Sequence, residues 1–144
     1  MDSNEPLDRL HDHQRRALDI LARGAAALDA GLDRERRDLR AEMADVLRNY
    51  QIFKHEEVFD PAVSSGSAER AALGRAMKIE CIAAGETFRT HSMRWKDEAI
   101  VADPANYRAA ARLTLNALRR HIEREGEGIT LLLAMLKKEM PKAA

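Results

Sequence analysis

The segment "LRRHIEREGEGITLLLAML", residues 118–136, places a histidine and a carboxylate within an apolar helical pattern. Leu118, Ile122 and Ile129 recur at helical spacing and predict a buried face, and Glu125 falls inside that face. His121 lies four residues before Glu125, so both side chains reach one region of a helical core. A buried carboxylate requires a cation, a proton or a metal ion, because burial removes its hydration.

Other polar residues fall on or near apolar faces elsewhere in the chain. His11 lies with Leu7 on the apolar side of the first expected helix, whereas His13 falls to its flank. Cys81 lies on the apolar side of the third expected helix. In the second, periodicity places Glu57 on the apolar face and Glu56 about a quarter-turn away. Carboxylates and imidazoles that converge from several helices are the ligands of iron and manganese sites in helical bundles. Structural alternatives stay open, with a hydrogen-bonded core histidine at His11 and a small buried thiol at Cys81.

Helix breakers divide the chain into four expected helices, over residues 6–28, 33–60, 68–100 and 104–140. Their signals are Pro6, a turn around Gly31, Pro61 with "SSGS", an N-cap at Ser67, and Asp103 followed by Pro104. Four long helices with short connections predict an all-α fold, an up-down-up-down antiparallel four-helix bundle. The 144 residues predict one domain over residues 1–144.

Composition narrows the class of protein and its compartment. Lysine and arginine balance aspartate and glutamate at 24 each, which gives no indication of a nucleic-acid partner. The single cysteine, Cys81, forms no intramolecular disulfide and suits a reducing compartment. The N-terminal residues do not form a signal peptide, and no apolar run approaches ~18 residues. We therefore expect a cytoplasmic protein with no membrane partner.

Four segments, taken in order, carry a family resemblance: "RLHDHQRRALDILA", "IFKHEEVFDP", "KIEC" and "HIERE". Together they resemble the hemerythrin-like (HHE cation-binding) domain, a four-helix bundle that holds a non-haem di-iron site. The last segment carries the full H-x-x-x-E motif of that family. In the second, Glu56 aligns with the bridging glutamate while Ile52 stands in a histidine position, and in the third Cys81 replaces a histidine. The metal ligands implied by the resemblance are His11, Glu56, Cys81, His121 and Glu125.

Two functions follow from this reading. The first is a hemerythrin-like metal-binding protein with an incomplete non-haem iron site, mononuclear or di-iron, involved in oxygen, nitric oxide or iron sensing. Because thiolates favour zinc, zinc is the second choice of metal. The second is a metal-free bundle that acts as an interaction or regulatory module, in which Ile52 and Cys81 fill the core and arginine or lysine neutralises the carboxylates. An empty site is also expected to leave two or three buried carboxylates that repel one another, so that at least one has a raised pKa and holds a proton near neutral pH.

Enzymatic function is not expected. A histidine phosphotransfer bundle needs a lysine near its histidine, and "IEREGEG" after His121 has none. Cys81 has no histidine base near it in the sequence, and a buried thiol resists ionisation. The sequence leaves a homodimer and the identity of any protein partner open.

Overall fold

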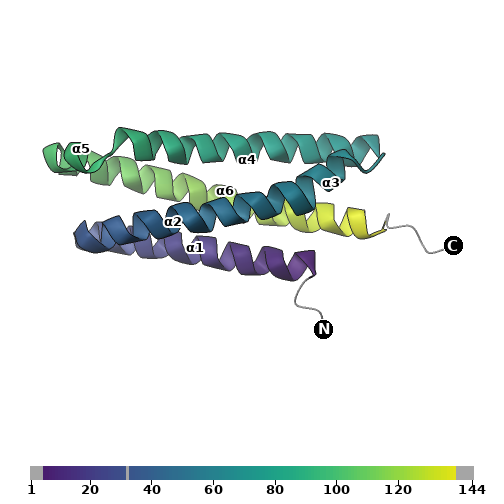
Figure 1. Cartoon of the computed structure of the whole chain (residues 1–144), viewed down its shortest axis with the longest axis horizontal. Coiled ribbons are helices and arrows are strands. Elements are labelled where there is room, and N and C mark those ends of the chain that lie inside the picture. Colours follow the sequence, from purple (N-terminus) through teal and green to yellow (C-terminus); the bar gives the residue numbers. More distant parts are fainter. Residues whose placement is uncertain (1–4, 32, 139–144) are drawn as a thin grey trace.

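The computed structural model describes residues 5–31 and 33–138, and over these residues the chain is all-helical (Figure 1). The long helices are α1 (Pro6–Ala30), α2 (Asp33–Lys54), α4 (Ala68–Arg94) and α6 (Pro104–Lys138). The shorter elements are the π-helical turn η1 (His55–Phe59), α3 (Asp60–Val63) and α5 (Asp97–Ala102). The described part of the chain contains no strand, so the predicted all-α class is confirmed.

Local signals in the sequence set most helix ends. Gly31 ends α1 with a left-handed φ of 69°, a conformation that glycine adopts without a steric penalty. Ser67 caps α4 by accepting a hydrogen bond from the Arg70 amide at 3.3 Å. Asp103 Oδ1 accepts one from the Asn106 amide, at 3.4 Å, at the start of α6. The predicted turn at Gly31 and the predicted caps are therefore confirmed, and α6 runs without interruption through the glycines near its middle.

The helix expected over residues 68–100 is interrupted at Trp95, whose backbone leaves the helical region with φ −111° and ψ 69°. The chain turns there and resumes as α5. The turn buries Trp95 in a small cluster with Ile100 and Tyr107. The Trp95 and Tyr107 rings pack edge to face, with their centroids 5.6 Å apart. Burial of these aromatic rings stabilises the break, which a helical reading of the sequence did not predict.

The second helix continues three residues past its expected end at Asp60. From α2 the chain passes through η1 into α3 without leaving the helical path, and Pro61 lies inside this stretch. A proline ring clashes with the carbonyl four residues earlier in a regular α-helix and has no N–H to donate. The wider η1 turn ends at Phe59, two residues before Pro61, and the Asp60 amide donates to His55 O, five residues back. The π turn thus accommodates a proline that was expected to end the helix.

Packing leaves one side of the molecule open. The α1 helix packs against both α2 and α6, and α6 packs against α4, whereas α2 and α4 face each other across a groove. Figure 1 shows the long helices side by side, with successive ones running in opposite directions. At one end of the groove, η1 and α3 contact α4. At the other, the Arg40 guanidinium donates to the backbone oxygens of Ser92 and Trp95.

The main core lies between the long helices. Its largest fully buried side chains are Leu10, Ile20, Tyr50, Val58, Phe59, Ile129 and Leu132. Apolar residues also lie on the outside, with Ile79, Met93, Val101 and Leu113 more than half exposed. Within residues 5–31 and 33–138, no helix combines the length and apolarity needed to cross a bilayer.

Candidate functional site

Glu125, the carboxylate in the apolar stripe of α6, is paired with a lysine. Lys54 Nζ from α2 lies 2.9 Å from Glu125 Oε1 and 3.1 Å from Oε2. The two side chains are only 6% and 3% exposed. The ammonium also lies over the Tyr50 ring, 4.1 Å from its centroid, in a cation–π contact. The buried negative charge is therefore neutralised within the protein.

This pairing keeps Glu125 ionised. Burial by itself raises the pKa of Glu125, but His121 and Lys54 together lower it more, so the net pKa lies below the ordinary value. His121 Nε2 lies 3.3 Å from Glu125 Oε2, one helical turn away as the spacing predicted. The expectation that a metal-free core leaves a protonated carboxylate is therefore wrong for Glu125, because Lys54 supplies the positive charge.

Hydrogen bonds extend this cluster to α1. Gln14 Nε2 donates to Tyr50 Oη at 3.1 Å and to the Ile122 carbonyl at 2.9 Å. A Cβ atom at position 126 would overlap the Gln14 amide, so Gly126 allows α1 and α6 to approach closely here. Burial, and secondarily the Glu125 charge, raises the pKa of Tyr50, so the phenol stays neutral.

The remaining long helix, α4, contributes Cys81 to this cluster. Its side chain is buried, and burial raises the pKa of the thiol although Lys54 acts to lower it. The thiol is therefore protonated at neutral pH and packs as a small apolar group. We call the set Gln14, Tyr50, Lys54, Cys81, His121 and Glu125 the central polar cluster.

His11 is exposed, which corrects its expected position on the inner side of α1. The buried side of α1 is centred on Leu10, Ala17 and Leu21, so the position one residue after Leu10 turns outward. His13, expected at the flank, is half-buried instead, and its ring stacks on Phe53 at 4.9 Å. The expected stripe was rotated because it included Leu7, which is 38% exposed near the start of the helix.

The register predicted for the second helix from the family motif is also wrong. Ile52 is 47% exposed and Glu56 is exposed, so neither faces the core. The inward positions are Tyr50, Phe53 and Lys54. Glu57, which periodicity favoured, lies closer to the core and forms an ion pair with Arg9 of α1.

Of the five predicted ligands, the structure brings only His121 and Glu125 into contact. Lys54 lies between Glu125 and Cys81, whereas His11 and Glu56 lie on the surface. Among the described residues, no group of three or more histidine, cysteine or acidic side chains is arranged to hold a metal ion. Lys54 was missed, although it follows Met43 by eleven residues and Tyr50 by four and therefore lies on their stripe.

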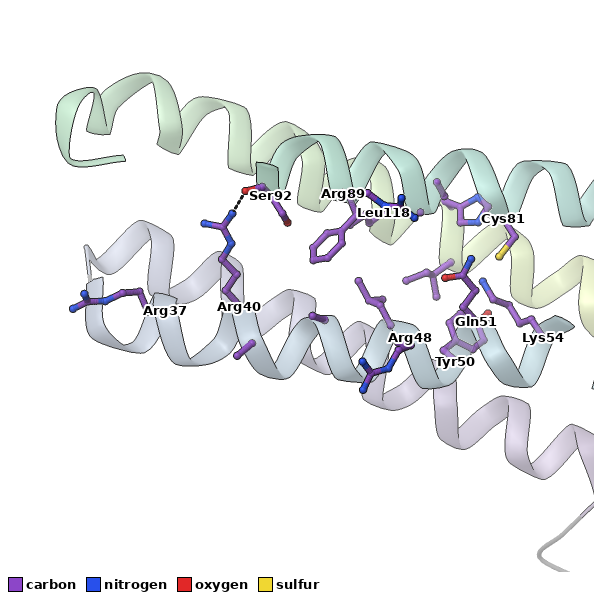
Figure 2. Close-up of a pocket in the computed structure, with 18 of the residues that line it drawn as sticks. Arg37, Arg40, Arg48, Tyr50, Gln51, Lys54, Cys81, Arg89, Ser92 and Leu118 are labelled. Carbon is purple, nitrogen blue, oxygen red and sulfur yellow. Dashed lines mark hydrogen bonds between the residues drawn. The ribbon is translucent and has the colours of Figure 1, made fainter. Parts of the chain in front are cut away.

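The groove between α2 and α4 adjoins the central polar cluster and has a volume of about 740 Å³. Its floor is apolar and includes Leu47, Phe88, Leu118 and Ile122. Figure 2 shows Tyr50, Gln51 and Lys54 of α2 and Cys81 of α4 at one end, and Arg37 and Arg40 of α2 toward the other.

Basic side chains border this groove. They are Arg37, Arg40 and Arg48 from α2, Arg89 from α4, and Lys96 from the segment that follows it. Among the described residues that line the groove, Asp97 is the one acidic residue, and its Oδ1 lies 3.9 Å from Arg36 Nη2. Because the whole chain has no net charge, this concentration of positive charge is a local property of the groove.

No protein-family model, curated protein or solved structure matches this chain. Two features of the structure bear on its function, the central polar cluster and the groove. These adjoin each other, since Tyr50, Lys54, Cys81 and His121 contribute to both.

Proposed function

We propose that the protein is a metal-free, non-catalytic binding module. Its architecture is an antiparallel four-helix bundle that is open between α2 and α4, and the groove on that side is its binding surface. The observation that carries the proposal is the buried ion pair in which Lys54 contacts both carboxylate oxygens of Glu125. This is the core position to which the sequence assigned a metal ion.

Electrostatics supports an ammonium rather than a metal at this position. A metal bound by Glu125 would compete with Lys54 for the same oxygens and would leave a buried ammonium without its counter-charge. Removing one partner from a buried ion pair costs about 3–5 kcal/mol, which metal binding would have to offset. The resemblance to hemerythrin-like domains fits a degenerate member of that family in which a lysine replaces the charge of the metal.

The groove supports the binding role. Its volume of about 740 Å³ lies within the roughly 300–1,000 Å³ range of small-molecule pockets. It combines an apolar floor with a few charged groups, a combination typical of ligand sites. Since the central polar cluster neutralises its own charges, its role in the proposal is to fix the helices that form the walls.

A second candidate keeps a metal. The contact of His121 with Glu125 favours it, and Cys81 lies beside the Lys54 that pairs with Glu125. A single zinc or iron ion would take one imidazole, one carboxylate and one thiolate from these residues. Such a site requires Lys54 to move away and Cys81 to lose its proton. The two candidates therefore differ in whether metal binding displaces the lysine.

Metal analysis decides between the candidates. The chain is purified without chelators or a histidine tag, its iron and zinc contents are measured, and thermal unfolding is followed with and without each metal. We expect substoichiometric metal and an unchanged melting temperature, because a ligand that does not bind the folded state does not stabilise it. Stoichiometric metal, or a metal-dependent rise in melting temperature that Glu125→Ala abolishes, would overturn the proposal.

A further inference from the structure

The dimensions of the groove indicate the shape of its ligand. Its lining residues on α2 run from Arg37 to Lys54, which corresponds to about 25 Å of helix at 1.5 Å per residue. A volume of about 740 Å³ lies within the roughly 300–1,000 Å³ range of small-molecule sites, so the groove is long and of small-molecule size. It has room for an extended hydrocarbon chain.

The charges at the two ends of the groove differ. At the inner end, Lys54 is neutralised by Glu125 and needs no further anion. At the outer end, Arg37 and Lys96 have no ion-pair partner among residues 5–31 and 33–138. Both residues are close in sequence to the contact of Arg40 with the Trp95 carbonyl. Arg37 precedes Arg40 by three residues on α2, and Lys96 directly follows Trp95.

The cations along the middle of the groove are available as well. Arg48 pairs with Asp45 and Arg89 pairs with Glu86, but all four side chains are more than half exposed. Exposed pairs of this kind contribute little to stability. An anion in the groove can therefore replace the carboxylate partner of either arginine at a small cost in free energy. Positive charge therefore borders the groove from its middle to its outer end.

We propose that the groove binds a single-chain anionic amphiphile, a long-chain carboxylate. Its head group lies between Arg37 and Lys96, and its tail extends along Leu47 and Phe88 toward Ile122. Binding is favoured because the tail removes the apolar floor from contact with water. The unpaired cations at the outer end attract the carboxylate and so fix the orientation of the ligand in the groove. This inference rests on the proposed function only in taking the groove as the binding surface.

The first experiment measures binding and charge preference. The purified full chain is titrated with the fluorescent fatty acid cis-parinaric acid, and dodecanoate, dodecanol and dodecyltrimethylammonium then compete below their micellar concentrations. We expect saturable binding at one site, with displacement strongest by dodecanoate and weakest by the cationic amphiphile. Hexanoate, with the same head group and a shorter tail, should compete poorly because it covers less apolar surface.

Variants then locate the ligand. The double substitution Arg37→Glu and Lys96→Glu should weaken dodecanoate binding by roughly tenfold or more, because the head group then faces like charges. Ala44→Trp places an indole on an exposed wall of the groove and should block the tail. The matched control is Arg34→Glu, a charge reversal at an exposed position of α2 outside the groove, which should leave binding unchanged.

Several outcomes would overturn the inference. They are absence of saturable binding, equal competition by the three head groups, unchanged affinity in both groove variants, and displacement of the probe by an acidic peptide but not by dodecanoate. Melting temperatures of all variants are measured in parallel, so that loss of folding is not read as loss of binding. A chain that binds both dodecanoate and stoichiometric metal contradicts the proposed function but not this inference. One that binds neither contradicts the inference alone.

Discussion

The two ends of the groove use positive charge in opposite ways. At the inner end, Lys54 is buried and both of its close oxygen contacts are to Glu125. At the outer end, Arg37 and Lys96 are exposed, and the described residues supply neither with an ion-pair partner. A charge that is buried with its partner belongs to the structure, because removing either group leaves the other uncompensated. A charge that lines an apolar groove without a partner remains available to a ligand.

The largest expected effect comes from breaking the Lys54–Glu125 ion pair at the inner end of the groove. Lys54→Met leaves the buried Glu125 carboxylate without its main counter-charge, and it should destabilise the fold by about 3–5 kcal/mol in denaturant unfolding. Adding Glu125→Leu removes the orphaned carboxylate, and this double variant should return to near wild-type stability. A single variant as stable as the wild type would show that the pair does not hold the inner end together.

A smaller effect concerns acid. The folded state lowers the pKa of Glu125 below its ordinary value of 4.5, so the contribution of this carboxylate to stability is fully present above pH 4.5. That contribution is lost as the pH falls through the lowered pKa. Glu125→Gln should therefore unfold with a shallower dependence on pH below 4.5 than the wild type. The measurement is the free energy of unfolding at a series of acidic pH values, and identical slopes for the two proteins would contradict the assignment.

The smallest effects fall on exposed positions. Ile52→Ala should change the free energy of unfolding by no more than about 0.5 kcal/mol, because the side chain is 47% exposed and fills no core space. Arg37→Ala at the outer end should be equally neutral for stability. Ile129→Ala, at a fully buried position of α6, is the contrasting control and should cost about 2–5 kcal/mol. A costly Ile52→Ala would place that side chain in the core and reverse the register of α2.

Local sequence signals predicted the elements better than the directions in which their side chains point. Gly31, Ser67 and Asp103 act through their own backbone or through amides a few residues away, so their effects are readable from the sequence. Facing directions are more sensitive, because one residue of error rotates a helical position by ~100°. That error was enough to place His11 in the core and leave His13 at the flank.

The central polar cluster was only half predictable for a different reason. The spacing of His121 and Glu125 within one helix was sufficient to place them together. The partner of Glu125 is 71 positions away in the sequence, and periodicity gives its facing direction without its distance. The sequence prediction considered histidines and acidic residues because these ligate metals. The group that neutralises the Glu125 carboxylate is a lysine, which does not ligate a metal when it is charged. The break at Trp95 likewise depends on aromatic contacts that form only in the folded chain.

The π turn between α2 and α3 also bears on how this chain is to be compared with others. A π turn holds one more residue than a regular helical turn, so it is the form that a single-residue insertion takes when a helix absorbs it without breaking. Residues 55–59 therefore form a position at which one residue could be gained or lost while the flanking helices keep their places. An ungapped comparison with a regular helix would shift the histidine and glutamates of "HEEVF" by one position relative to the residues on either side.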